Sequence, residues 1–165
     1  MFAFAPPAGA AGEADAVRQS FQALKTALLQ DSGEEAARLV SRSTLALSDK
    51  ARDLALYGSQ AELEAQPTAL LTAALSLRQS IGAQKLSSMP GRTLVVYVVD
   101  TNLTRDGPVA NIDLGGVRVD QASAIADLVS DQPFPVSQLQ FAKEDGLWKL
   151  DRTGVAYGQA ALEKF

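Results

Sequence analysis

The sequence predicts an α+β fold in which helices from the first half of the chain pack on an antiparallel sheet of about four strands from the second half. Apolar residues recur at helical spacing in the first half, and strand-like segments between turn residues make up the second half. A β-hairpin with one apolar face lies near the end of the chain. At 165 residues the chain is long enough for one core. We expect a flexible N-terminal lead at 1–12 and a single domain over 13–165.

The hairpin gives the most specific prediction. An Asp145-Gly146 pair supplies the positive φ angles of a tight type I′ turn. With these two residues as the turn, Phe141 lies opposite Leu150 and Lys143 opposite Trp148. This register puts Leu139, Phe141, Trp148 and Leu150 on one face, and Gln138, Gln140 and Lys149 on the other.

Helical periodicity, acidic first turns, a Ser-x-x-Glu capping box and glycine stops predict helices through the first half. The expected helices cover residues 13–30, 34–40, 45–57, a short stretch opened by Ser59 to Glu62, and 68–80. The helix over 68–80 has a broad apolar face, so we expect it to pack between the sheet and the other helices.

The segment 93–100 is continuously apolar and rich in β-branched residues. Propensity favours a buried strand, although periodicity alone does not distinguish a short buried helix from a strand. A loop is expected over 102–108.

Gly115-Gly116 separates the strand-like segments 109–114 and 117–120, which indicates either a tight hairpin or one bent strand with a glycine bulge. Residues 122–130 read as the next strand. Pro133 and Pro135 bound the turn into the final hairpin, and residues 159–164 have helical propensity.

The amino-acid composition excludes several kinds of catalytic and metal-binding site. The chain has no cysteine and no histidine, which removes disulfides, thiolate chemistry, the commonest metal ligand and the commonest general base. A net charge of -4 and scattered basic residues give no phosphate-binding field, so nucleic acid is not an expected partner. No cofactor or metal is predicted.

Localisation stays open on sequence grounds. No apolar run approaches the roughly 18 residues that a membrane-spanning helix needs. The first twelve residues lack the charged and apolar regions of an intact signal peptide, but a lead rich in Ala, Pro and Gly could follow a cleaved one. The cytoplasm and the periplasm both fit.

Several helices followed by a meander that ends in Lys143-Glu-Asp-Gly-Leu-Trp-Lys-Leu-Asp151 resemble the NTF2-like, or cystatin-like, α+β cone superfamily. The segment from 75–78 through 86–92 resembles part of uncharacterised bacterial proteins with such domains. The resemblance implies a curved sheet wrapped around a long helix, and a more helical segment at 93–100. The superfamily contains isomerases, dehydratases, transport factors and binding modules, so fold alone does not give function. No residue-by-residue match to a catalytic pattern is found.

Five residues are candidates for a binding site. Arg78 could bind a carboxylate or phosphate, or instead pair with an acidic residue or reach solvent. Asp113 and Asp127 would have raised pKa values if they pointed into an apolar cone, and would be solvated if they pointed outward. Tyr57 and Tyr97 could donate hydrogen bonds to a ligand or pack at the core boundary.

We expect a non-catalytic domain that binds a protein partner or a small apolar ligand, with a homodimer left open. The alternative is a small histidine-free enzyme of isomerase or dehydratase type that uses Asp and Tyr in the cone. An exported domain acting in envelope assembly or as an immunity factor is a third hypothesis.

Overall fold

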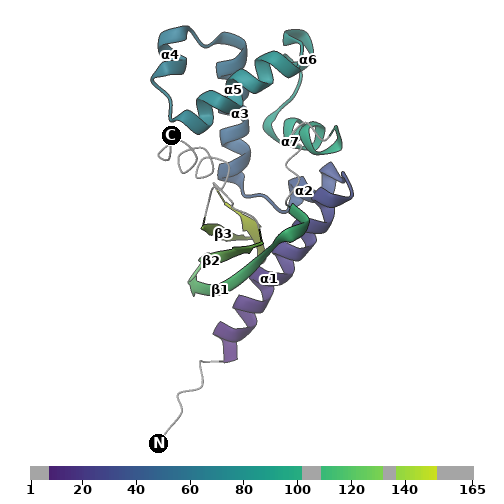
Figure 1. The fold of residues 1–165 in the computed structure, drawn as a ribbon, viewed down its shortest axis with the longest axis vertical. Helices are drawn as coiled ribbons and strands as arrows, with labels where there is room; N and C mark the ends of the chain where they lie inside the picture. Colours follow the sequence, from purple (N-terminus) through teal and green to yellow (C-terminus); the bar gives the residue numbers. More distant parts are fainter. Residues whose placement is uncertain (1–7, 102–108, 132–136, 152–165) are drawn as a thin grey trace, which may run out of the picture.

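The computed structural model describes residues 8–101, 109–131 and 137–151. Its fold is α+β, with helices in the first half of the chain and strands in the second (Figure 1). The helices are α1 (Ala8–Leu29), α2 (Gly33–Arg38), α3 (Arg42–Tyr57), α4 (Gln60–Glu64), α5 (Thr68–Ser80), α6 (Ala83–Ser87) and α7 (Gly91–Asp100). A single 3-10 turn, η1 (Val109–Asn111), precedes the strands.

The strands form one curved, open antiparallel meander in the order β1-β2-β3-β4. They are β1 (Ile112–Asp120), β2 (Ser123–Ser130), β3 (Gln138–Glu144) and β4 (Leu147–Leu150). Helix α1 runs across one face of this sheet, while α3 to α6 form a separate helical layer beyond its β4 end (Figure 1). The predicted fold class is therefore confirmed.

The final hairpin has the predicted register. Phe141 pairs with Leu150 and Lys143 with Trp148. Asp145 and Gly146 have φ angles of 52° and 78°, the left-handed values that a type I′ turn needs. Local turn chemistry was enough to predict this part of the sheet.

Between the two alternatives for Gly115-Gly116, the structure has one bent strand. The pairing of β1 with β2 shifts between Leu114 and Val117, so the two glycines form a bulge inside β1. The strand predicted over 122–130 is β2.

The strand favoured by propensity over 93–100 is wrong, because this segment is helix α7. Its N-terminus is fixed by the Asp49 carboxylate, which accepts a hydrogen bond from the Gly91 N–H at 2.7 Å. A Cβ on Gly91 would lie 2.4 Å from the Leu45 carbonyl oxygen, so only glycine lets α7 approach α3 this closely. Tertiary packing against α2 and α3 thus overrides the β propensity of the valines.

Other helix bounds differ modestly from those predicted. Helix α1 begins at Ala8, ahead of the expected start at Glu13, and α3 begins at Arg42 because the Ser41 side chain accepts a hydrogen bond from the Thr44 N–H. The capping box at Ser59 and Glu62 is present. Helix α6 was not predicted. The expectations for 102–108, Pro133, Pro135 and 159–164 lie outside the described residues.

The predicted position of the 68–80 helix is wrong. Helix α5 packs on α3 and α4, in the layer away from the sheet (Figure 1). Leu75 on this helix is 39% exposed. The broad apolar face of α5 therefore packs into a small helical core, which also includes buried residues of α3, α4 and α6.

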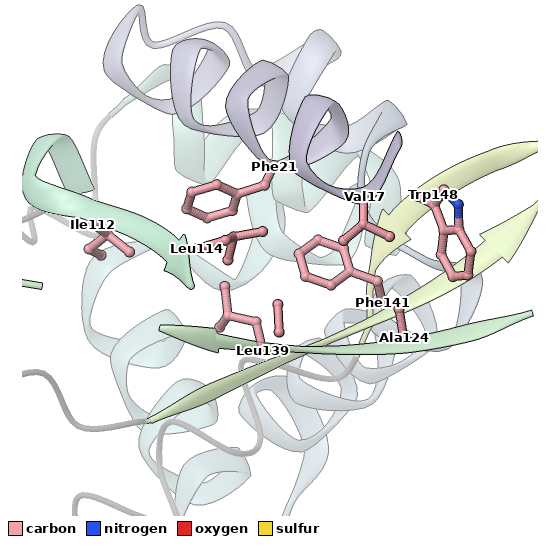
Figure 2. Close-up of a cluster of buried hydrophobic side chains, with 9 residues drawn as sticks. Val17, Phe21, Ile112, Leu114, Ala124, Leu139, Phe141 and Trp148 are labelled. Carbon is pink, nitrogen blue, oxygen red and sulfur yellow. The ribbon is translucent and has the colours of Figure 1, made fainter. Parts of the chain in front are cut away.

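The main core lies between α1 and the inner face of the sheet. Val17 and Phe21 of α1 point toward Phe141, Leu139 and Ile112 of the sheet (Figure 2). Trp148 and Phe141 are both at most 2% exposed. The long helix and the concave face thus bury each other.

Candidate functional site

The inner face of the sheet, where the cone interpretation would place a ligand, is occupied by side chains of α1. Val17 has no exposed surface and packs with Phe141 and Leu114 (Figure 2). Burial of this kind is the ordinary packing of a helix on a sheet. The candidate carboxylates of β1 and β2 do not enter this interior.

Asp127 lies on the outer face of the sheet. Its Oδ1 accepts a hydrogen bond from Gln138 Nε2 at 3.1 Å and lies 3.4 Å from Arg118 Nη2. The hydrogen bond from Gln138, followed by the charge of Arg118, holds the pKa of Asp127 below its ordinary value. Of the two alternatives for Asp127, the outward one therefore holds: the carboxylate does not enter an apolar cone, and its neighbours favour the ionised form.

Asp113 follows the same alternation, since it stands between the buried residues Ile112 and Leu114. Its carboxylate accepts hydrogen bonds from Gln22 Nε2 at 3.0 Å and from the Leu114 N–H at 2.9 Å. These contacts hold the carboxylate at the open edge of β1, outside the core. Asp113 and Asp127 are thus both satisfied by local donors.

Arg78 acts on the C-terminal end of α3. Its guanidinium donates to the carbonyl oxygens of Leu54, Ala55 and Gly58 at 3.1, 2.8 and 3.1 Å. The Leu54 carbonyl also accepts a hydrogen bond from the Gly58 N–H, whereas carbonyls in the last turn of an α-helix otherwise lack an intrahelical partner. A cation at this end also opposes the helix dipole. Three of its donors are committed to backbone, so Arg78 is a helix cap in this structure.

The two tyrosines lie on different helices. Tyr57 ends α3 and is 75% exposed. Tyr97 of α7 is half-buried, and Lys85 Nζ lies 3.2 Å from its hydroxyl and 4.3 Å from its ring centre. Neither tyrosine joins Asp113 or Asp127. The residues proposed for an enzyme are therefore not brought together.

Although the five candidate residues do not form one site, the outer face of β1 to β3 offers a surface for binding. Ile125 and Val129 of β2 are 37% and 53% exposed there, large fractions for apolar residues in a central strand. Polar side chains of the flanking strands surround them. We call this surface the outer patch; it comprises Arg118, Ile125, Asp127, Val129, Gln138 and Gln140.

The glycine bulge helps to keep the outer patch open. A Cβ on Gly115 would lie 3.2 Å from Val129 Cγ2, and one on Gly116 would lie 3.2 Å from Asp127 Oδ2. Because neither glycine has a side chain, β1 leaves the sides of Val129 and Asp127 uncovered. The bulge therefore shapes the patch as well as bending the strand.

The start of α3 covers the other end of the outer face. The Arg42 N–H donates to the Glu144 carboxylate at 3.2 Å, and Glu144 lies 3.6 Å from Lys149 Nζ. Ser41 donates to Asp151 at 2.5 Å, and Ser43 donates to the same carboxylate. The outer patch is thus bounded on the β4 side by these contacts.

Sequence reasoning missed the outer patch. Alternation could have placed Asp113 outward, because its neighbours Ile112 and Leu114 are apolar. No local signal distinguishes exposed Ile125 and Val129 from buried core residues, because β2 reads as a mixed segment. Only the position of α1 shows which face is covered.

Within residues 8–101, 109–131 and 137–151, no three acidic side chains gather in a way that could hold a metal ion. None of the helices in that part of the chain is both long enough and apolar enough to cross a membrane. Comparisons with protein-family models, curated proteins and solved structures found no match. The resemblance to the NTF2-like superfamily stays a prediction.

Proposed function

We propose that this protein is a non-catalytic binding domain that recognises a protein partner through the outer patch. The observation that carries the proposal is the exposure of Ile125 and Val129 on a sheet whose other face is packed against α1. A sheet with one packed face presents its other face to solvent, and apolar residues there are available for contact.

The packed interior favours a protein over a small apolar ligand. A ligand on the concave face would have to displace Val17 or Phe21, which are 0% and 7% exposed. Opening a cavity in a core of this kind costs several kcal/mol, on the order of 2–5 for each large side chain removed. Contact on the outside requires no such rearrangement.

The chemistry of the outer patch also fits a protein interface. Ile125 is flanked along its row by Arg118 and Gln140, and Asp127 is flanked by Gln138. Protein interfaces combine an apolar centre with a polar rim that can exchange hydrogen bonds. Arg118 and Asp127 neutralise each other, so recognition would depend on shape and hydrogen bonds more than on net charge.

Val129→Lys tests the proposal against a matched control. Val129 and Leu29 are 53% and 54% exposed, but Leu29 lies at the end of α1, away from the outer patch. Wild type, Val129→Lys and Leu29→Lys would each serve as bait in a lysate of the source organism. Each protein captured by wild type is then purified, whether or not Val129→Lys retains it, and is titrated calorimetrically with all three baits.

We expect Val129→Lys to weaken binding of the purified partner by about tenfold or more, and Leu29→Lys to bind like wild type. Equal binding by Val129→Lys and wild type would contradict the proposal. So would saturable binding of the dye 8-anilinonaphthalene-1-sulfonate to the native protein that Phe21→Trp abolishes and Val129→Lys leaves unchanged, because that result would place an apolar site in the interior.

A further inference from the structure

The open edge of β1 is divided in two by the glycine bulge. In the first part, side chains take the outward backbone groups. Lys25 Nζ donates to the Ile112 carbonyl at 2.7 Å, Arg18 Nη1 donates to the Leu114 carbonyl at 3.2 Å, and Asp113 accepts from the Leu114 N–H. This part of the edge is closed by α1 and by Asp113.

The second part of the edge, 117–120, is different. The Leu128 N–H donates to the Ser137 carbonyl, so the backbone groups of Leu128 face β3. Backbone groups of every second residue in a strand face the same neighbour, and those of Ala126 and Ala124 therefore also face β3. Their β1 partners Val117 and Val119 then direct their own N–H and C=O groups away from β2. None of the described residues makes a hydrogen bond to these outward groups.

The side chains of this open edge are self-complementary. Val117 and Val119 are half-buried against the core on the inner face. Arg118 and Asp120 are exposed on the outer face, with opposite charges two residues apart. Charged residues on an edge strand normally discourage pairing, but opposite charges at this spacing favour an antiparallel copy of the same strand.

We propose that two copies of this chain associate by antiparallel pairing of their β1 edges, centred on Val119. Val119 then lies opposite Val119 of the second copy, and the two residues exchange both of their outward hydrogen bonds. Arg118 of each copy lies opposite Asp120 of the other, in the closer, non-hydrogen-bonded position. The contact is isologous, as a two-fold dimer requires.

Charge selects this register over its neighbour. A shift that centres the pairing on Arg118 would place the two arginines directly opposite each other, which is repulsive. The extended edge ends at Gln121, whose φ angle of 54° begins the turn into β2. The ladder is therefore short, and the dimer is expected to be reversible and concentration-dependent.

The pairing has a consequence for the outer patch. A two-fold axis perpendicular to the sheet keeps the outer faces of both copies on the same side. The two outer patches would then share one continuous surface, with α1 of each copy on the opposite side. The dimer does not depend on the proposed function, because its backbone hydrogen bonds are made by the edge. Arg118 belongs both to this edge and to the outer patch, whereas Asp120 belongs to the edge and not to the patch.

Charge reversal and mixing test the proposal. Arg118→Asp places an aspartate opposite Asp120 of the second copy, and Asp120→Arg places an arginine opposite Arg118. Sedimentation equilibrium at increasing concentration should show wild type forming dimers and each single variant remaining monomeric. An equimolar mixture of the two variants should form a heterodimer, because both opposing pairs then have opposite charges. The double variant Arg118→Asp/Asp120→Arg should recover the homodimer.

Fold is checked by far-UV circular dichroism and urea midpoints for every variant. Arg118→Asp also removes the contact with Asp127, but Asp120→Arg leaves that contact intact and so isolates the effect on the edge. A wild type that stays monomeric at concentrations up to about 1 mM, where an association free energy of about −4 kcal/mol would still populate dimer, would overturn the proposal. A wild-type dimer that both single variants retain, or a mixture that stays monomeric, would also overturn it.

Discussion

Trp148 donates its indole N–H to a carboxylate oxygen of Glu13 at 2.7 Å. The other oxygen of Glu13 accepts from Lys143 Nζ, also at 2.7 Å, and Lys143 lies 5.8 Å from the centre of the Trp148 ring. One carboxylate therefore joins α1 to both strands of the final hairpin. This contact helps to hold the helix across the concave face, which is therefore occupied, whereas the outer face of the sheet carries the exposed residues of the outer patch.

The Glu13 contact predicts a pH dependence. The hydrogen bonds from Lys143 and then Trp148 hold the pKa of Glu13 below its ordinary value of 4.5. A carboxyl whose pKa is lower in the folded state stabilises the fold above its ordinary value, and this contribution is lost as pH falls through the folded pKa. The urea midpoint of wild type should exceed that of Glu13→Gln at pH 7, and the difference should shrink below about pH 4.5. A difference that is unchanged on acidification would show that the charge of Glu13 contributes nothing.

Shortening a side chain of the main core should lower the free energy of unfolding. Phe141 is 2% exposed between α1 and the sheet, and Phe141→Ala should lower the free energy of unfolding by about 3–5 kcal/mol. Val129→Ala, on the exposed face of the same sheet, should change it by no more than about 0.5 kcal/mol. Urea unfolding followed by fluorescence of Trp148, the one tryptophan of the chain, measures both. Comparable losses in the two variants would contradict the assignment of inner and outer faces.

The type I′ turn gives a prediction that depends on backbone conformation alone. Gly146 has a φ angle of 78° and open space around its Cβ position, so Gly146→Ala should cost about 1–2 kcal/mol through its left-handed conformation. Gly12 has equally open space but lies within helix α1, where alanine is preferred over glycine, so Gly12→Ala should not destabilise the protein. Thermal unfolding of the two variants separates conformation from crowding. If both substitutions had the same effect, the turn assignment would fail.

Arg78 is expected to stabilise the helical layer rather than to bind a ligand. Arg78→Met removes three hydrogen bonds to the end of α3 and should cost about 1–2 kcal/mol, a reduced value because the side chain is exposed. Arg38→Met, which removes an exposed pair with Glu35, should cost less than about 0.5 kcal/mol. Denaturation midpoints of the two variants provide the comparison. Equal midpoints for Arg78→Met and wild type would show that these hydrogen bonds do not stabilise the fold and would contradict the assignment of Arg78 as a helix cap.

The parts of the fold that local chemistry determines were predictable from the sequence. The Asp145-Gly146 turn fixes the register of β3 and β4, and helical periodicity locates α1 and α5. Segment 93–100 was not predictable from propensity, because its helix depends on contacts with α2 and α3 that lie far away in the sequence. The capping contacts of Arg78 are likewise long-range.

The site was less predictable than the fold. Asp113 and Asp127 were identified as residues of interest, but their surroundings depend on which face α1 covers. Glu13 attracted no attention as a sequence feature, although it holds α1 to the hairpin. The outer patch arises from strand pairing and the glycine bulge together. Neither feature shows that Ile125 and Val129 are exposed until the face covered by α1 is known.

Methyl NMR of the labelled protein tests the central claim most directly. On titration with a purified protein partner, the Ile125 and Val129 methyl signals should shift together and saturate at one equivalent per chain, while the Leu29 and Val17 methyl signals stay in place. Shifts centred on Val17 and other core methyls, with Ile125 and Val129 unmoved, would contradict the assignment of the outer patch as the binding surface.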